Sequence, residues 1–193
     1  IEGVRTGWPS YMPYQGGGEM VVCHDFSTTS GGLVISSRAA KGSGNWSSSY
    51  LYGPAGHEDV AWPRAITGGD EYDAIHAIYL TKSTVNLGGP YQGLEGALLY
   101  SRSTDGGTTW NPHNFILPGM DAASNYGFGG DSYTWAAPMG DTIAFVVGDS
   151  WSDLYIMKST DGGSTWNKIM VWENPYPKFN LSNLIVTDTF YCP

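Results

Sequence analysis

The densest group of side chains capable of chemistry is the run His57-Glu58-Asp59. Ionised carboxylates accept hydrogen bonds from hydroxyl groups, and aromatic rings stack on apolar faces. Such groups could line a cup that binds a carbohydrate or a peptide. The alternative is a solvated strand end, where acidic side chains satisfy backbone amides. Hydrolysis by two carboxyl groups would require a defined separation between them, which a sequence does not supply.

Patterns for other chemistry are absent from the sequence. The four histidines form no H-E-x-x-H pair, and there is no phosphate loop or nucleophile elbow. Cys23 and Cys192 lack the spacing of a zinc site, so they could form one disulfide or remain two buried thiols. His76 lies within an apolar run, where a packed side chain is expected. We therefore expect no metal and no cofactor.

Composition narrows the class of protein. The 193 residues include 18 acidic and only 9 basic side chains, a net charge of −9, which argues against a nucleic-acid partner. Charged residues make up 14%, while 27 Gly, 8 Trp and 13 Tyr indicate a turn-rich β protein in one domain. No apolar stretch approaches the ~20 residues that span a bilayer, so this chain shows no membrane anchor.

An internal repeat determines how the strands are expected to lie. The segment LYSRSTDGGTTWN at 99–111 returns as IMKSTDGGSTWN at 156–167, and the two aspartates, Asp105 and Asp161, are 56 residues apart. A third, eroded copy occupies 33–46 and ends at Trp46. Each copy has an apolar run, a polar glycine turn and a tryptophan, which is the pattern of a β-hairpin.

Further strands are expected upstream of each hairpin, at 20–23, 74–80 and 142–147, and first strands before those at 7–9, 61–63 and 133–136. Four short strands recurring every ~55–65 residues predict an all-β fold, a β-propeller with four-stranded antiparallel blades. The expected units are blade 1 at about 1–55, blade 2 at about 56–122, blade 3 at about 123–178 and the start of a fourth at about 179–193. Because propellers close with four to eight blades, the remaining blades are expected from the same or another chain.

The repeated motif Ser-x-Asp-x-Gly-x-Thr-Trp resembles the Asp-box, or BNR repeat, of sialidases and related propellers. The resemblance implies a sialidase-like propeller of six to eight blades, in which the Asp-box is a structural hairpin away from the ligand. The residues that carry the motif are Ser103, Asp105, Gly107, Trp110, Ser159, Asp161, Gly163 and Trp166.

A sialidase active site, as the resemblance implies, holds the substrate carboxylate with three arginines and uses a Tyr paired with a Glu as nucleophile and an Asp as acid/base. Arg38 and Arg102 lie on the hairpin strands and are expected to face outward. Arg64 follows Trp-Pro and departs from the family's Arg-Ile-Pro signature. Arg5 and Asp59 remain as catalytic candidates.

The start of each first strand is the expected place for ligand contacts, since first strands line the central channel of a propeller. Aligning Trp8, Trp62, Trp135 and Tyr191 places Arg5, Asp59, Ser132 and Asp188 at matching positions. The long loop 81–96 could contribute as well. The candidate binding residues are His57, Glu58, Asp59, Asp131, Tyr133 and Asp188.

Three hypotheses about function follow. The first is a secreted, extracellular or periplasmic, Asp-box propeller that serves as a binding or scaffold module for glycans or a protein. The second is part of an exo-acting glycoside hydrolase of sialidase type. The third is a purely structural set of blades within a larger surface protein.

Overall fold

The chain forms strands wherever apolar, β-branched and aromatic residues gather between glycine-rich turns. The computed structural model describes residues 5–26, 31–149 and 152–175, together with the backbone of 185–187 and 190–192. In chain order the elements are β1 (Thr6–Tyr14), η1 (Gln15–Gly17), β2 (Gly18–Asp25), β3 (Leu33–Arg38), β4 (Ser47–Leu51), β5 (Val60–Gly68), β6 (Ala74–Thr81), η2 (Thr84–Asn86), β7 (Leu98–Ser103), β8 (Tyr133–Trp135), β9 (Ile143–Val147), β10 (Leu154–Ser159), β11 (Asn167–Trp172), β12 (Ile185–Thr187) and β13 (Phe190–Cys192).

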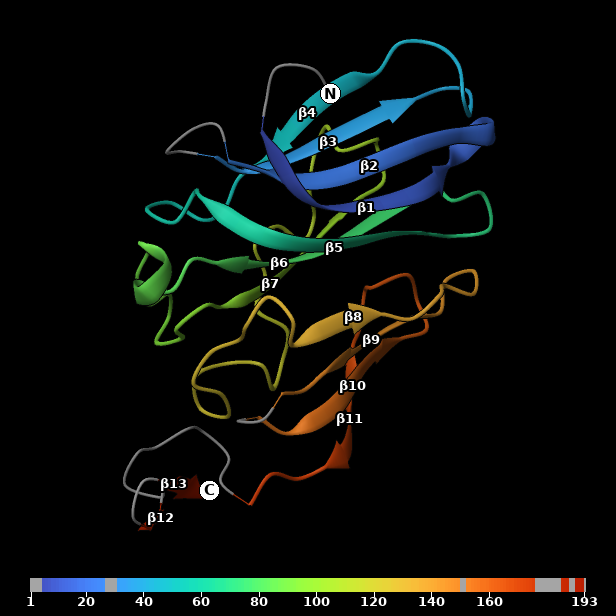
Figure 1. Cartoon of the computed structure of the whole chain (residues 1–193). Helices are drawn as coiled ribbons and strands as arrows, with labels where there is room; N and C mark the ends of the chain where they lie inside the picture. Colours follow the sequence, from blue (N-terminus) through green and yellow to red (C-terminus); the bar gives the residue numbers. More distant parts are fainter. Residues whose placement is uncertain (1–4, 27–30, 150–151, 176–184, 188–189, 193) are drawn as a thin grey trace.

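These strands make consecutive antiparallel sheets, as Figure 1 shows. The first sheet has the order β1-β2-β3-β4, the second β5-β6-β7 and the third β8-β9-β10-β11, and β12 pairs with β13. Each expected strand segment upstream of a hairpin overlaps one of these strands, and the segments 142–147 and 133–136 each extend one residue beyond it. The fold is therefore all-β and antiparallel. The blade boundaries near residues 55, 122 and 178 stay a prediction.

The second sheet lacks the fourth strand that the repeat predicts. Phe115 exchanges two backbone hydrogen bonds with Tyr100 on β7, of 2.8 and 2.9 Å, and forms only an isolated bridge. Pro112 lacks the N–H that a longer ladder needs, and Asn114 has a positive φ of 54°. Asn111 and Pro112 still bond to Arg102 on β7, but the pairing is interrupted before Phe115, so no continuous fourth strand forms.

The first strands of the three sheets lie side by side. The backbone N–H of Ala65 on β5 donates to Ser10 Oγ on β1 at 3.1 Å, and the Trp135 indole on β8 donates to the carbonyl of Arg64 at 2.9 Å. Since β2, β6 and β9 return antiparallel, they end where β1, β5 and β8 begin. We call this the leading end of the sheets, and the opposite end the turn end.

Two first strands share the same irregularity. Trp8 and Trp62 both have a φ of 51°, both precede a proline, and both sit where the register with the second strand shifts. Left-handed backbone at a bulky residue is strained and occurs at bulges that redirect side chains. The third sheet does not repeat it, and Trp135, aligned with these two from the sequence, lies beside Arg64 instead.

The two Ser-x-Asp turns, 103–110 and 159–166, are closed by their own side chains. In the first, Asp105 Oδ1 accepts the backbone N–H groups of Thr108 and Thr109 at 3.1 and 2.8 Å, while Oδ2 accepts the Thr109 hydroxyl at 2.6 Å. Ser103 Oγ in turn accepts the Gly107 N–H at 2.9 Å. The second turn repeats these bonds at Asp161. The bonds to the carboxylate lower the pKa of each aspartate to about 2.

Each turn also packs on the sheet that precedes it. Gly107 lies against Ile35 and Ser49 of the first sheet, and Gly163 lies against Tyr100 of the second. The Arg102 guanidinium donates to the carbonyl of Gly162 at 2.8 Å, and so joins the second sheet to the turn of the third. Thus the turns connect neighbouring sheets as well as neighbouring strands.

Aromatic rings fill the space between the second and third sheets. Trp166 meets Tyr100 edge to face at 5.0 Å and Phe145 at 5.5 Å. His76 is fully buried beside them, with Nδ1 2.8 Å from the Tyr100 hydroxyl. The expectation of a packed His76 agrees with this position.

We expect Gly163→Ala to destabilise the protein more than Gly107→Ala. Both glycines have a similar positive φ, 82° and 85°, so the backbone penalty of roughly 1–2 kcal/mol is common to both variants. A Cβ at 163 would stand 2.0 Å from the buried Tyr100 hydroxyl, whereas at 107 its nearest neighbours are 3.4 Å away. The overlap should add roughly 1–3 kcal/mol.

The measurement is chemical unfolding of both variants at neutral pH. Equal losses of unfolding free energy would show that Tyr100 moves aside, and would contradict tight docking at this contact.

Candidate functional site

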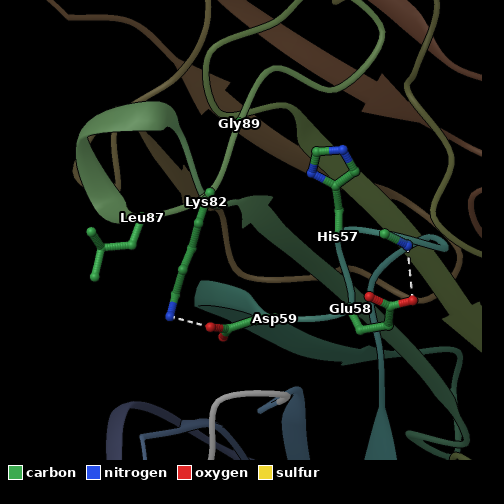
Figure 2. Close-up of a pocket in the computed structure, with 8 residues that line it drawn as sticks. His57, Glu58, Asp59, Lys82, Leu87 and Gly89 are labelled. Carbon is green, nitrogen blue, oxygen red and sulfur yellow. Dashed lines mark hydrogen bonds and ion pairs between the residues drawn. The ribbon is translucent and has the colours of Figure 1, made fainter.

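The leading end of the second sheet carries a surface hollow of about 370 Å³ (Figure 2). One wall is the segment that enters β5, and the other is the loop that leaves β6. The lining residues are Gly56, His57, Glu58, Asp59, Lys82, Leu87, Gly88 and Gly89. The run identified from the sequence, His57 to Asp59, therefore lies within one concave site.

The charged groups of the hollow are held in place by short-range contacts. Lys82 forms an ion pair with Asp59, because the end of β6 lies beside the start of β5. Glu58 Oε1 accepts the backbone N–H of Gly56 at 2.8 Å, which lowers the pKa of Glu58. Figure 2 shows Lys82 extended toward Asp59, with Glu58 directed away from this pair. The site thus presents both hydrogen-bond donors and acceptors.

The second wall is a loop with an exposed apolar residue. The Glu95 carboxylate accepts the N–H and the hydroxyl of Thr84, both at 2.8 Å, and so fixes the short helix η2. Leu87 follows in a left-handed conformation, and the residue is 98% exposed. On the other side of the hollow, the His57 ring meets Tyr91 edge to face at 5.2 Å. Apolar and aromatic surface therefore flanks the polar groups.

The other candidate residues divide between the surface and the core. Arg5 and Asp131 are exposed at the starts of β1 and β8, at the leading end. Tyr133 differs from the expectation of a ligand contact: it is buried, and its hydroxyl donates to the Trp62 carbonyl at 2.5 Å. The apolar alternation of β8 turns this ring into the core. Asp188 lies outside the described residues.

An aromatic cluster adjoins the first strands at the leading end. His24, at the end of β2, is buried between Trp8 at 5.5 Å, Phe26 at 3.7 Å and Trp62 at 6.4 Å. Its Nδ1 accepts the Trp62 backbone N–H at 3.1 Å, so the neutral ring carries its hydrogen on Nε2. Nε2 has no partner within the described part of the chain. Burial lowers the pKa of His24 to about 4.

A tyrosine and a glutamate do pair in this structure, but at the turn end. Tyr11 on β1 donates its hydroxyl to Glu19 Oε2 at 2.5 Å, and Glu19 also binds Arg38 and the Gly42 N–H. These bonds lower the pKa of Glu19 to about 2 and raise the pKa of Tyr11. The Tyr11–Glu19 pair is thus part of a bonded network at the turn end, away from the groups at the leading end.

The structure adds three further observations. Cys23 is a free, buried thiol, and the Cys192 side chain lies outside the described residues. Among the described residues no three His, Cys, Asp or Glu side chains gather as metal ligands would. No helix in that part of the chain is long and apolar enough to cross a membrane.

Sequence reasoning missed Lys82, the partner of Asp59. The signal was weak: Lys82 is one polar residue directly after the apolar strand β6, and nothing in its spacing points to residue 59. The pairing of β5 with β6, which places Val60 opposite Thr81, brings the two together.

Comparison with known sequences shows distant relatives. No protein-family profile matches the chain. A xyloglucanase from Hypocrea jecorina (strain QM6a) is 32% identical over 118 residues, which are 61% of this chain and 12% of that protein. A xyloglucanase from a Paenibacillus species is 33% identical over 107 residues, 54% of this chain and 10% of that protein. The chain thus spans about a tenth of the length of these relatives.

Solved structures share the fold at low identity. A protein of unknown function from Dyadobacter fermentans gives a TM-score of 0.56 at 15% identity, covering 87% of this chain and 55% of that one. Trypanosoma rangeli sialidase gives 0.55 at 14%, covering 86% and 30%. A Coprinopsis cinerea α-L-arabinofuranosidase catalytic domain gives 0.50 at 17%, covering 89% and 52%. The chain therefore has a fold shared with sialidases and other glycosidases.

We expect stability to fall as the pH is lowered from 7 to 5. His24 and His76 are buried, and burial lowers each pKa to about 4, below the value of ~6.5 in the unfolded chain. The unfolded state therefore binds protons first, and stability present above pH 6.5 is lost on the way to pH 4. Each histidine should contribute about 2 kcal/mol of loss between pH 7 and 5.

Urea unfolding of His24→Gln and His76→Gln at both pH values tests this. Each variant should lose about half of the pH dependence, while His113→Gln, at an exposed position, should keep it. A wild-type protein equally stable at pH 7 and 5 would show that the two rings are not buried in neutral form.

Proposed function

We propose that this chain is part of an Asp-box β-propeller that binds glycans at the leading end of its sheets. The observation that carries the proposal is the hollow between the segment that enters β5 and the loop that leaves β6. It combines an ion pair, a carboxylate and exposed apolar surface, which together suit the hydroxyl groups and apolar faces of a sugar. The fold shared with glycosidases supports this reading.

The propeller is supported by the way that successive sheets dock. In the aligned third strands, Ile35, Tyr100 and Ile156 occupy equivalent positions. The first contacts Gly107 of the next Ser-x-Asp turn, and the second contacts Gly163 of the one after. If each further sheet docked on its predecessor through the same contact between a third strand and a turn glycine, the sheets would be arranged around a central axis lined by β1, β5 and β8.

The third sheet carries an apolar face suited to a further blade. Ile156 pairs with Ile169, and Leu154 with Trp172, so these side chains share a face. Ile169 and Trp172 are 45% and 52% exposed. We propose that a following blade, from the same or another chain, covers this face in a ring of six to eight blades. Exposed apolar surface of this kind marks interaction sites.

Secretion to the cell exterior or the periplasm fits a protein that meets glycans there, and it belongs to the same proposal. The second candidate, an exo-acting hydrolase of sialidase type, makes a different prediction, because it requires turnover.

Glycan binding should depend on the ion pair in the hollow. We expect Asp59→Ala and Lys82→Ala each to weaken binding by about tenfold or more, since each removes a charged hydrogen-bonding group. Folding should change by roughly 1–2 kcal/mol, because both side chains are about a quarter exposed and the pair lies between the exposed and the buried case. Lys158→Ala, at an exposed position on β10, is the matched control and should bind as wild type does.

Calorimetry with xyloglucan oligosaccharides, arabino-oligosaccharides and sialyllactose provides the measurement, and released sugar is assayed in the same samples. Saturable binding without turnover supports the binding module. Turnover of sialyllactose that is lost in Asp59→Ala would favour the hydrolase. Binding to none of the three, by folded protein, would overturn the proposal.

A further inference from the structure

The four arginines of the chain differ sharply in what they are free to bind. Recognition of a ligand carboxylate is best served by an arginine fork that can approach both of its oxygens. Arg38 is committed to Glu19 at the turn end, where it also lies over the Trp46 ring at 4.7 Å. Arg102 donates to the Gly162 carbonyl and to Ser164 Oγ, at 2.8 and 3.1 Å. Neither can reach a ligand at the leading end.

The two arginines nearer the leading end are not arranged as a clamp. Arg64 donates to the carbonyls of Pro63 and Gly130, at 3.2 and 3.4 Å, and is half-buried against the Tyr133 ring. Arg5 is exposed, 6.0 Å from the centre of the Phe26 ring on the first sheet. The hollow itself is lined by no arginine, and its one lysine, Lys82, is neutralised by Asp59.

The charged side chains that line the hollow carry a net negative charge, because Glu58 and Asp59 are opposed by Lys82 alone. Glu58 stays ionised, because the Gly56 N–H stabilises its carboxylate. A ligand carboxylate placed in the hollow would therefore meet repulsion that the Lys82–Asp59 pair does not offset.

We infer that this site takes uncharged glycans and discriminates against glycans that carry a carboxylate, such as sialosides and uronides. The inference rests on the proposed function and names the substrate class of the same hollow. A sugar hydroxyl can donate to Glu58 or Asp59 and accept from Lys82. An uncharged ligand carries no net charge, so the negative charge of the hollow does not weaken its binding. The expected discrimination is roughly tenfold, which is the scale of one unscreened charge pair at short range.

The test compares two forms of one ligand, a neutral oligosaccharide and the same molecule with a terminal hydroxymethyl group oxidised to a carboxylate. In low salt the folded protein should bind the neutral form about tenfold more tightly. The ratio should shrink at high salt, because ions screen exposed charges. Glu58→Gln removes the charge and keeps an acceptor for the Gly56 N–H, so it should shrink the ratio in low salt as well.

Glu71→Gln is the matched control, since this exposed glutamate lies in the hairpin between β5 and β6 at the turn end. It should leave the ratio unchanged. Equal or tighter binding of the oxidised ligand by wild type would overturn the inference and leave glycan binding intact. A ratio unaffected by Glu58→Gln would overturn it too, because the discrimination would not come from this field. Failure of both ligands to bind would overturn the proposed function itself.

Discussion

The contact between each Ser-x-Asp turn and the preceding sheet is the constraint on which the arrangement of the sheets depends. Gly107 lies against Ile35 of the first sheet, and Gly163 lies so close to Tyr100 of the second that a Cβ would stand 2.0 Å from the hydroxyl. The aspartates act inside the turns, where each carboxylate accepts two backbone N–H groups and two hydroxyl groups. The bonds that close each turn therefore also hold the turn in the shape that packs on the preceding sheet.

That packing places functional groups at the opposite end of the sheets. Because turns join strands at one end, the starts of β1, β5 and β8 meet the loops that leave the second strands at the other. The hollow around Asp59 and Lys82 arises there from two segments more than 20 residues apart. Contacts between sheets occur at this end as well, because Tyr133 donates to the Trp62 carbonyl and the Trp62 N–H donates to His24.

In this protein the buried polar groups have structural roles, whereas the candidate binding groups line the surface hollow. The Tyr133 hydroxyl, the His76 ring and the Glu19 carboxylate each bind a neighbouring strand or sheet, and each connects elements that apolar packing alone would leave free to slide. The charged side chains at the leading end make fewer bonds to neighbouring strands and sheets. The Tyr11–Glu19 pair, which has the residue types of a catalytic pair, therefore connects strands at the turn end. Lys82, which no sequence pattern singled out, lines the hollow instead.

Local sequence patterns were sufficient to predict the all-β class, the approximate positions of most strands and the two repeated turns, since alternation of apolar residues and the Asp-Gly-Gly chemistry are local properties. They also indicated His57, Glu58 and Asp59. Three features became visible only in the folded chain: Lys82 completes their site, Tyr133 is buried, and the second sheet ends after three strands. Those outcomes depend on strand register, on sheet-to-sheet packing and on prolines that break a ladder, and each of these couples residues far apart in the chain.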